Sequence, residues 1–488
     1  MMRLLRTYDA LPTPAKAAVW FAVCSAVQSG ASFLAIPFLT RLMSQEQYGI
    51  VTLYNSWRQI VIIFATLNVY AGVFNVGMTK WKDERDRYLS SMIGLTLVLV
   101  LIAAAVYLVF RNPLDALFQL DTPFMLIMFV QIFASTVFSL WSARERFEYR
   151  YKALLLVTFA YAFIGQAVSV LCTWSVQDDA SKALVSVLSL SIALMVLALF
   201  IVGDACRKGR AFIDMRFWKH AVLFNLPLVP HYLATLILGQ ANRIMIASMN
   251  GKAEAAIYGV AYTVGLMIQI VTGAISNAMI PWLFGKLSKR EPAGVSRLIE
   301  LSTLGVGALN LLVVLAAPEI MSIVGPESYQ EGIYVIPPVA ASMLMTFVYG
   351  FFANIELFYE KKFGVALASV CAAVANVGLN LWALPRFGYL SAGYTMLTCY
   401  TLLALGHYLY ARRAARVGRV PGLLNGLRIF ACCIAFVPIG ALAVCLYPFP
   451  LVRLALCVVL AFVFYCKRSQ IATLMRHVRE RPASTDAS

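Results

Sequence analysis

The stretch from Asn225 to Tyr262, NLPLVPHYLATLILGQANRIMIASMNGKAEAAIYGVAY, has the length of a transmembrane helix but carries residues that a plain span lacks. Polar and helix-breaking residues interrupt its apolar background: Pro227, Pro230, His231, Gln240, Asn242 and Arg243. A guanidinium in hydrocarbon costs roughly 2.5–3.5 kcal/mol on insertion scales, so it is kept where it faces a watery cavity or an anionic partner. The stretch therefore predicts a membrane span with a role beyond anchoring.

The rest of the chain has the composition of a multi-pass membrane protein. Of its 488 residues, 61% are hydrophobic and 13% are charged, whereas a soluble domain carries about 25% charged residues. Apolar runs of about 20 residues, each long enough to cross a bilayer, recur along the chain. We predict an all-α integral membrane protein with spans near residues 17–40, 49–77, 88–110, 123–143, 153–175, 182–203, 221–249, 255–282, 297–318, 334–358, 364–384, 391–411, 426–446 and 451–466.

The net charge of +17 is explained by where the cations lie. Most of the 40 Lys and Arg residues fall in loops that these spans place on one side of the membrane. Two lie within spans, Arg58 and Arg243, and the loops on the other side contain Arg41, Arg111, Lys182, Lys252, Arg386 and Arg453. Cytoplasmic loops carry such an excess, so both termini are predicted to be cytoplasmic. We expect anionic membrane lipids, and not nucleic acid, to be the partners of this charge.

Short motifs resemble one family of membrane proteins. Pro227 to His231 (PLVPH), Asn242 to Met245 (NRIM) and Tyr258 to Tyr262 (YGVAY) are together similar to the seventh helix of Wzx-type polysaccharide translocases. Thr40 to Leu42 (TRL) and Gln47 to Gly49 (QYG) resemble the junction of the first two helices in the same family. These translocases are lipid-linked oligosaccharide flippases of the superfamily that also contains the MATE multidrug exporters. The family usually has Asp where this sequence has Asn before the arginine of the second motif.

An internal repeat predicts the domain organisation. Tyr48-Gly49 and Tyr258-Gly259 each follow a short polar loop, and six predicted spans separate them. Repeats in the same orientation are related by an axis along the membrane normal. We therefore expect two six-helix bundles around a central cavity, as the resemblance also implies, with an amphipathic interfacial helix around Phe212–Trp218 in the linker between them. The predicted domains are an N-terminal bundle (1–203), a cytoplasmic linker (204–220), a second bundle (221–411), two additional transmembrane helices (412–466) and a cytoplasmic tail (467–488).

The candidate substrate-binding residues are polar groups inside or at the ends of spans. Arg58 lies nine residues past Gly49, roughly 13 Å deep at 1.5 Å per residue. Two alternatives stay open, in which Arg58 pairs with a helix carbonyl or Arg243 extends to the surface. His231 is a candidate that packing alone would also explain. The full set is Arg41, Asn55, Arg58, His231, Gln240, Asn242 and Arg243.

Glu356 is a candidate for ion coupling, although its position five residues before Lys361 also fits an interfacial ion pair. The sequence contains no C-x-x-C spacing, P-loop, Gly-rich dinucleotide turn or paired carboxylates in one segment. We therefore predict no catalytic residue, no metal site and no cofactor.

These features predict a transporter and not an enzyme. Arginine binds diphosphate groups through two parallel hydrogen bonds, and the resemblance implies a flippase that translocates undecaprenyl-pyrophosphate-linked oligosaccharide. The expected setting is O-antigen or exopolysaccharide synthesis at a bacterial inner membrane, by alternating access through a cationic central cavity. The expected protein partners are a polysaccharide polymerase and a chain-length regulator. A MATE-type multidrug or cation exporter of the same fold and a membrane-embedded polysaccharide polymerase are the alternatives.

Overall fold

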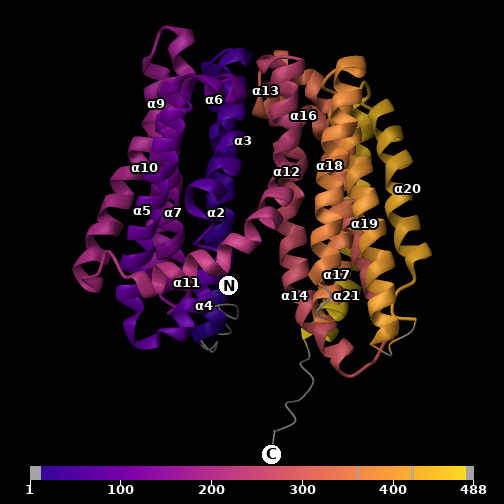
Figure 1. The fold of residues 1–488 in the computed structure, drawn as a ribbon. Coiled ribbons are helices and arrows are strands. Elements are labelled where there is room, and N and C mark those ends of the chain that lie inside the picture. Colours follow the sequence, from indigo (N-terminus) through magenta and orange to yellow (C-terminus); the bar gives the residue numbers. More distant parts are fainter. Residues whose placement is uncertain (1–12, 360–361, 419, 421, 480–488) are drawn as a thin grey trace, which may run out of the picture. The chain divides into compact units, whose positions relative to one another are not determined.

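The computed structural model describes residues 13–359, 362–418, 420 and 422–479, and the regular structure throughout them is helical, without a strand (Figure 1). This confirms the predicted all-α membrane fold. The chain divides into two compact units, Met1–Ala256 and Ile257–Ser488, here called unit 1 and unit 2. The sequence places its domain boundary in the linker 204–220, and the predicted six-helix bundles remain a prediction.

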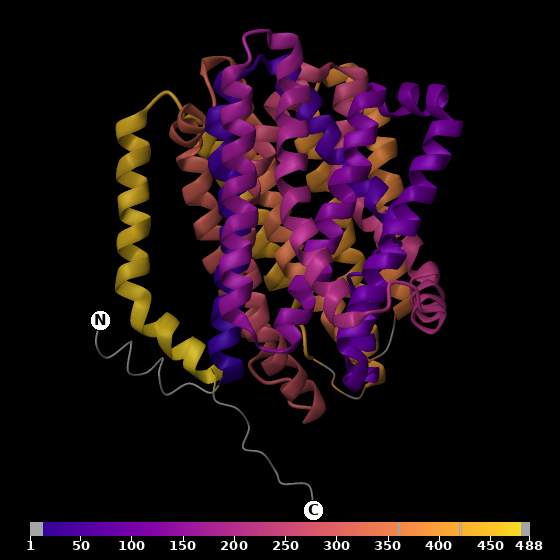
Figure 2. The ribbon, with the colours of Figure 1, turned by 90° about the vertical axis from the view of Figure 1, so that its left-hand side faces the viewer.

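Unit 1 contains long helices that run side by side, as Figures 1 and 2 show for α5, α7, α9 and α10. The elements of this unit are α2 (Thr13–Leu42), α3 (Gln45–Thr66), α4 (Gly72–Lys80), η1 (Lys82–Glu84), α5 (Arg85–Val109), α6 (Arg111–Phe118), α7 (Thr122–Phe147), α8 (Tyr151–Phe159), η2 (Ala160–Ile164), α9 (Gly165–Ser175), α10 (Asp179–Gly209), α11 (Met215–Asn225), η3 (Leu226–Leu228) and α12 (Val229–Met249).

Helix α13 (Lys252–Gly265) begins in unit 1 and continues into unit 2. In unit 2, α17 packs most extensively against α19, and α15 packs against α20. The elements of this unit are η4 (Leu266–Ile268), α14 (Gln269–Ser288), α15 (Val295–Leu315), α16 (Ala317–Val324), η5 (Glu327–Tyr334), α17 (Ile336–Phe358), α18 (Lys362–Phe387), α19 (Ser391–Val417), α20 (Gly426–Cys445) and α21 (Pro450–Arg479).

Every predicted span overlaps at least one helix of the structure. Within the described residues, 11 helices are long and apolar enough to cross a membrane, or 12 when one bent pair is counted as a single span. Helices α3 and α19 are not among them. Both are flanked by other helices, which cover part of their polar side chains, such as Thr52 and Ser56 on α3 and Thr395 and His407 on α19. The count of fourteen spans therefore remains a prediction.

The span predicted at 49–77 is broken. Helix α3 ends at Thr66, and Leu67 and Asn68 follow with left-handed φ values of 50° and 53°. Non-glycine residues are uncommon in this region. The chain becomes helical again at Gly72 as α4. A discontinuous helix of this kind leaves backbone groups free for other partners, which is tolerated in a membrane only where protein or a watery cavity covers them.

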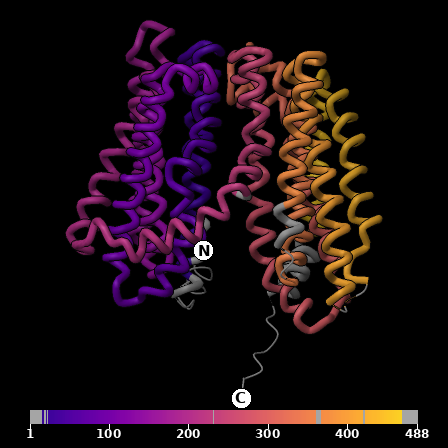
Figure 3. Tube along the Cα trace, in the orientation of Figure 1, coloured from indigo at the N-terminus to yellow at the C-terminus, as the bar shows by residue number. Residues whose placement is uncertain are grey.

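Two further spans depart from a regular α-helix. A π-helical turn, Ala160–Ile164, joins α8 to α9, and such turns are rare and often found at functional sites. Helices α11 and α12 meet at a bend of 57°, which Figure 3 traces. Pro227 and Pro230 lie at this bend and lack the N–H groups that a continuous helix needs. The weakened helix predicted at these prolines is thus observed.

The amphipathic helix expected around Phe212–Trp218 is present as α11, which starts at Met215. Its apolar face is anchored in unit 1. Phe217 is fully buried and packs edge-on against Tyr88, with ring centroids 5.1 Å apart. The Trp218 indole donates a hydrogen bond to the Ser91 carbonyl at 2.9 Å.

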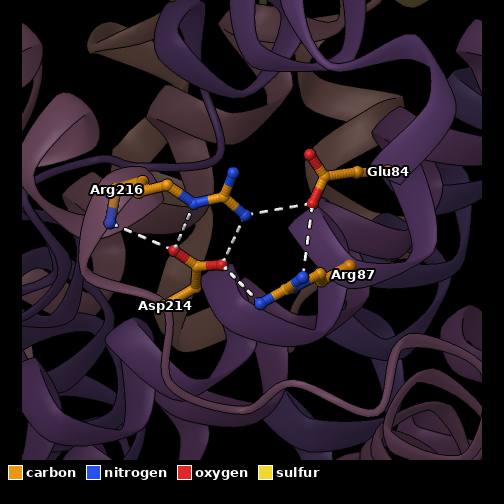
Figure 4. Close-up of polar contacts among 4 residues, drawn as sticks. All are labelled: Glu84, Arg87, Asp214 and Arg216. Carbon is orange, nitrogen blue, oxygen red and sulfur yellow. Dashed lines mark hydrogen bonds and ion pairs between the residues drawn. The ribbon is translucent and has the colours of Figure 1, made fainter.

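A closed ring of ion pairs holds the start of α11 on the start of α5 (Figure 4). The Asp214 carboxylate accepts from Arg216 at 2.9 Å and lies 3.1 Å from Arg87. Glu84 completes the ring, with Arg216 at 3.0 Å and Arg87 at 3.5 Å. The Asp214 side chain also caps the helix by accepting from the Arg216 N–H, which satisfies one of the donors left free at a helix start.

Candidate functional site

Arg58 lies on α3 in a half-buried position without a counter-charge. Its Nε atom is buried and has no hydrogen-bond partner, and its guanidinium forms no ion pair with any residue that the structure describes. The adjacent Trp57 packs edge-on against Phe118, and its indole Nε1 atom is likewise buried without a partner. Each of these buried donors is costly while it lacks an acceptor. The arrangement therefore favours an acceptor-rich, anionic ligand.

Three tyrosine side chains are influenced by the charge of Arg58. Tyr54, Tyr70 and Tyr161 are all within electrostatic range of its guanidinium. They come from separate parts of unit 1: α3 itself, the break after α3, and the π-helical turn. The break and the π-helical turn thus each supply one phenol to the surroundings of a single arginine.

Two of these tyrosines are held firmly by neighbours. The Tyr54 hydroxyl donates to Gln131 Oε1 on α7 at 2.7 Å. The Tyr161 ring stacks on Phe138, with centroids 4.0 Å apart and planes 11° apart. Ordered phenols beside a guanidinium offer hydrogen-bonding groups and aromatic faces next to a positive charge. Such a surface suits a ligand that has both an anionic group and hydroxyl groups.

Arg243 lies on α12, near the start of α3 and not near Arg58. Arg243 is within electrostatic range of Tyr48, and Tyr48 precedes Arg58 by ten residues, or about 15 Å along a helix. The start of α3 approaches the start of α13 so closely that a Cβ on Gly49 would collide with the Lys252 carbonyl oxygen. The two span arginines therefore lie at different levels of α3.

The remaining predicted residues occupy several environments. Gln240 and Asn242 are buried on α12, and the Gln240 Oε1 atom has no hydrogen-bond partner among the described residues. Asn55 is half-buried on α3, one turn before Arg58. Arg41 is exposed, and its Nη1 donates to the Pro37 carbonyl at 2.9 Å. The side chain of His231 lies outside the described residues.

Glu356 has a partner that the spacing along its own helix did not suggest. Glu356 on α17 is fully buried, and its Oε1 atom lies 2.9 Å from Nδ1 of the equally buried His407 on α19. Lys361, the partner suggested by sequence spacing, lies outside the described residues. Spacing along one helix could not show that α19 packs against α17 and brings His407 to this carboxylate.

Unit 2 also contains a buried cluster of amide and hydroxyl side chains. The Asn380 Nδ2 atom donates to Asn376 Oδ1 at 3.2 Å, as expected for residues four apart on one helix face. Thr395 on α19 adds a hydrogen bond to Asn380 Oδ1 at 2.6 Å. Thr395 belongs to a predicted span, but no sequence pattern connected it to the asparagines.

The structure offers no obvious metal site in its described part. None of these residues form a group of three or more His, Cys, Asp or Glu side chains that could hold a metal ion. The ten cysteines are all free thiols. The chemistry of the candidate site is therefore that of hydrogen-bond donors, phenols and one guanidinium.

The fold is similar to that of solved MOP-superfamily transporters. The lipid II flippase MurJ in an inward closed conformation matches with a TM-score of 0.66 at 11% identity, over 93% of this chain and 100% of that chain. An inward-facing multidrug resistance MATE transporter of the MOP superfamily matches with a TM-score of 0.57 at 13% identity, over 83% and 95%. At these identities the matches show the fold alone, which places this chain in the class of multi-pass helical membrane proteins.

Sequence matches define the family within that class. Residues 15–287, more than half of the chain, match the polysaccharide biosynthesis protein family. An uncharacterised membrane protein of Haemophilus influenzae is 20% identical over 365 residues, which span 71% of this chain and 84% of the relative. Lsg locus putative protein 1 of the same organism is 18% identical over 271 residues, 53% and 63% of the two chains. The chain belongs to the polysaccharide biosynthesis protein family, which confirms the resemblance to Wzx-type flippases.

Proposed function

We propose that this protein is a flippase that moves undecaprenyl-pyrophosphate-linked oligosaccharide repeat units from the inner to the outer leaflet of a bacterial inner membrane. The family supports a role in polysaccharide biosynthesis, and the fold supports a transporter. The observation that carries the proposal is Arg58, a span arginine with no ion-pair partner among the described residues and with tyrosines around it.

The chemistry of this site matches the proposed headgroup. A guanidinium binds two phosphate oxygens at once, and the indole of the preceding residue, Trp57, is a second buried donor without a partner among the described residues. The hydroxyls and rings of Tyr70 and Tyr161 suit the sugar next to the diphosphate, while the prenyl chain stays in lipid. Arg243, at another level of α3, provides a second contact point for a headgroup that moves along the unit.

The energy source need not be a carboxylate in unit 1. Moving a negative headgroup outward through an inside-negative potential releases about 2.3 kcal/mol per charge for each 100 mV. We further propose that the protein has fourteen spans, that both termini are cytoplasmic and that transport proceeds by alternating access. The products would be O-antigen or exopolysaccharide, with a polysaccharide polymerase and a chain-length regulator as working partners.

The test is complementation of a deletion strain at matched membrane levels. Arg58→Ala should relieve the insertion cost of the charge, express normally and abolish surface polysaccharide. Arg58→Lys should keep partial activity, because it retains a charge but loses the planar fork of donors. At Arg243, too, the alanine variant should lose more surface polysaccharide than the lysine variant, but both losses should be smaller than at Arg58. Arg386→Ala is the matched control, because Arg386 is exposed and donates only to the Trp382 carbonyl of its own helix.

Full complementation by both alanine variants would remove the main support for an anionic substrate. A MATE-type exporter of the same fold is the second candidate, favoured by the MATE match. It predicts a different result, in which a deletion strain keeps its surface polysaccharide and becomes sensitive to cationic drugs. The surroundings of Arg58 argue against a cationic substrate, since like charges repel in a low dielectric.

A further inference from the structure

Unit 2 holds two buried titratable side chains that the proposed substrate site does not use. Glu356 on α17 is 0% exposed and His407 on α19 is 1% exposed, and Glu356 Oε1 lies 2.9 Å from His407 Nδ1. The other polar atoms of the two side chains, Oε2 and Nε2, are also buried and have no hydrogen-bond partner among the described residues. The pair is therefore sealed from water in this conformation.

Aromatic rings extend the pair toward the middle of the two helices. Tyr349 lies two turns before Glu356, and Tyr400 lies two turns before His407. The Tyr349 ring stacks on both neighbours, on His407 with centroids 5.5 Å apart and on Tyr400 with centroids 6.4 Å apart. Phenols titrate far above neutral pH. Besides these phenols, the column contains one carboxyl and one imidazole, those of Glu356 and His407.

The charged side chains that the structure describes on the helices packed against α17 have other partners or are exposed. Lys286 on α14 pairs with Glu291 at 2.7 Å, and Glu300 on α15 accepts from Ser296 at 3.0 Å. The remaining titratable groups in electrostatic range of Tyr400 are neutral phenols and a thiol. The exposed cations of these helices are Arg297, Arg386, Arg412, Arg413, Arg416 and Arg428. Among the described residues, Glu356 thus has one charge-compensating partner, His407.

We propose that the Glu356–His407 pair is a proton-binding site that is loaded and emptied during transport. The proposal rests on the proposed transport function but not on the identity of the substrate. One proton shared by the pair leaves it with no net charge, whether the acid or the imidazole carries it. Removal of that proton leaves a buried carboxylate, and a second proton leaves a buried imidazolium; burial disfavours both.

A metal ion fits this site poorly. Only one carboxylate and one imidazole converge here, and no described group of three or more His, Cys, Asp or Glu residues could hold a metal ion. Sodium, calcium and magnesium prefer several oxygen ligands. A proton needs only the two atoms already within hydrogen-bond distance, so it is the ligand that the pair can take without rearrangement.

Burial couples the proton to a change of conformation. The proton cannot reach water while both side chains are covered, so exchange requires α17 and α19 to separate or water to enter between them. A state in which the pair is hydrated tolerates the unprotonated form better than the sealed state does. Proton occupancy therefore biases the equilibrium between the two states. In a transport cycle the proton leaves to water on one side and a new one is taken up on the other.

The first experiment needs no transport substrate. Purified full-length protein with carbon-13-labelled glutamate carboxyls is titrated and followed by infrared difference spectroscopy. We expect a carboxyl band that titrates in the wild-type protein, is absent in Glu356→Gln and has a shifted midpoint in His407→Gln. Glu300→Gln is the matched control, because Glu300 is also a buried carboxylate of unit 2, and it should retain the band. An unchanged titration in Glu356→Gln would overturn the proposal.

The second experiment tests coupling in proteoliposomes with undecaprenyl diphosphate as the probe. One proton per cycle lets a gradient of one pH unit shift the leaflet distribution of the probe by up to about tenfold. We expect Glu356→Gln to lose this shift but to keep gradient-independent exchange. A Glu356→Gln protein that still responds to the gradient contradicts the coupling. If the wild type moves no probe, the proposed substrate fails, while the infrared titration still decides whether the pair binds a proton.

Discussion

Units 1 and 2 each hold a charged side chain inside a predicted span, and they treat it in opposite ways. In unit 1, Arg58 has tyrosines around it and no carboxylate partner among the described residues. In unit 2, Glu356 is fully buried and pairs with His407. Because His407 already pairs with Glu356, this carboxyl has no need of a charged substrate, and the ligand that it can still bind is a proton. An uncompensated charge needs a partner from outside, which makes Arg58 the better candidate for contact with a substrate.

The largest effect is expected when Arg58 is given a carboxylate partner within the protein, which removes the difference between the two units. Tyr161→Glu places an acidic group within electrostatic range of the guanidinium and makes unit 1 resemble unit 2. The added acid should leave folding intact, because its negative charge offsets the positive charge of the half-buried Arg58. It should abolish surface polysaccharide as completely as Arg58→Ala does, in the same complementation assay.

Tyr161→Phe is the control that shows whether the loss of activity in Tyr161→Glu comes from the added negative charge or from the loss of the tyrosine hydroxyl. It keeps the stacking on Phe138 and adds no acid, so it should retain most of the activity. If Tyr161→Glu complemented the deletion strain as well as Tyr161→Phe, neutralisation of Arg58 would be harmless and the guanidinium would have a structural role.

The second test removes the internal compensation in unit 2. His407→Leu leaves Glu356 without its partner, and breaking a buried pair in this way costs about 3–5 kcal/mol. The unfolding midpoint of the purified protein in detergent should fall accordingly. The double variant Glu356→Met/His407→Leu should recover most of the loss, because apolar replacement of a whole buried pair is often neutral or stabilising. A double variant no more stable than His407→Leu would show that packing, and not charge, sets the stability here.

The smallest effect concerns charges outside the spans, in the ring of Glu84, Arg87, Asp214 and Arg216. Hydrogen bonds from Arg216 lower the pKa of the Asp214 carboxyl below its usual value. Its stabilising contribution is therefore complete above the ordinary pKa of aspartate and is lost as the pH falls through the lowered value. Hydrogen exchange of the α11 amides, corrected for intrinsic rates, should become faster in that acidic range. The two arginines are largely exposed, so the change should be modest.

Asp214→Asn should remove this acid-sensitive step and speed α11 exchange slightly at neutral pH. Asp204→Asn is the control, because the Asp204–Lys208 pair is exposed on α10 and forms no ion pair with α11. Acid sensitivity of α11 that persists in Asp214→Asn would assign the docking of this helix to Phe217 and Trp218 alone.

The candidate site was predictable as a set of residues but not as an arrangement. An arginine inside an apolar segment is visible in the sequence because its insertion cost is large and local. The tyrosines beside Arg58 were not identified, since Tyr70 and Tyr161 reach it only through the break after α3 and the π-helical turn. Nothing in a hydrophobicity pattern signals either backbone irregularity. His407 was missed for a related reason, because a single histidine in an apolar helix carries no indication of its partner.

The sequence by itself determined the membrane class, the family motifs and the position of every predicted span on a helix. These features depend on local properties: the length of apolar runs, the side preference of cations and the absence of N–H groups at Pro227 and Pro230. Only the tertiary structure decided which buried charges are compensated. Compensation depends on distances of a few ångströms between side chains on separate helices, and the packing of α17 on α19 sets the distance between Glu356 and His407. Helix packing therefore separates a charge that can meet a substrate from one that the protein neutralises itself.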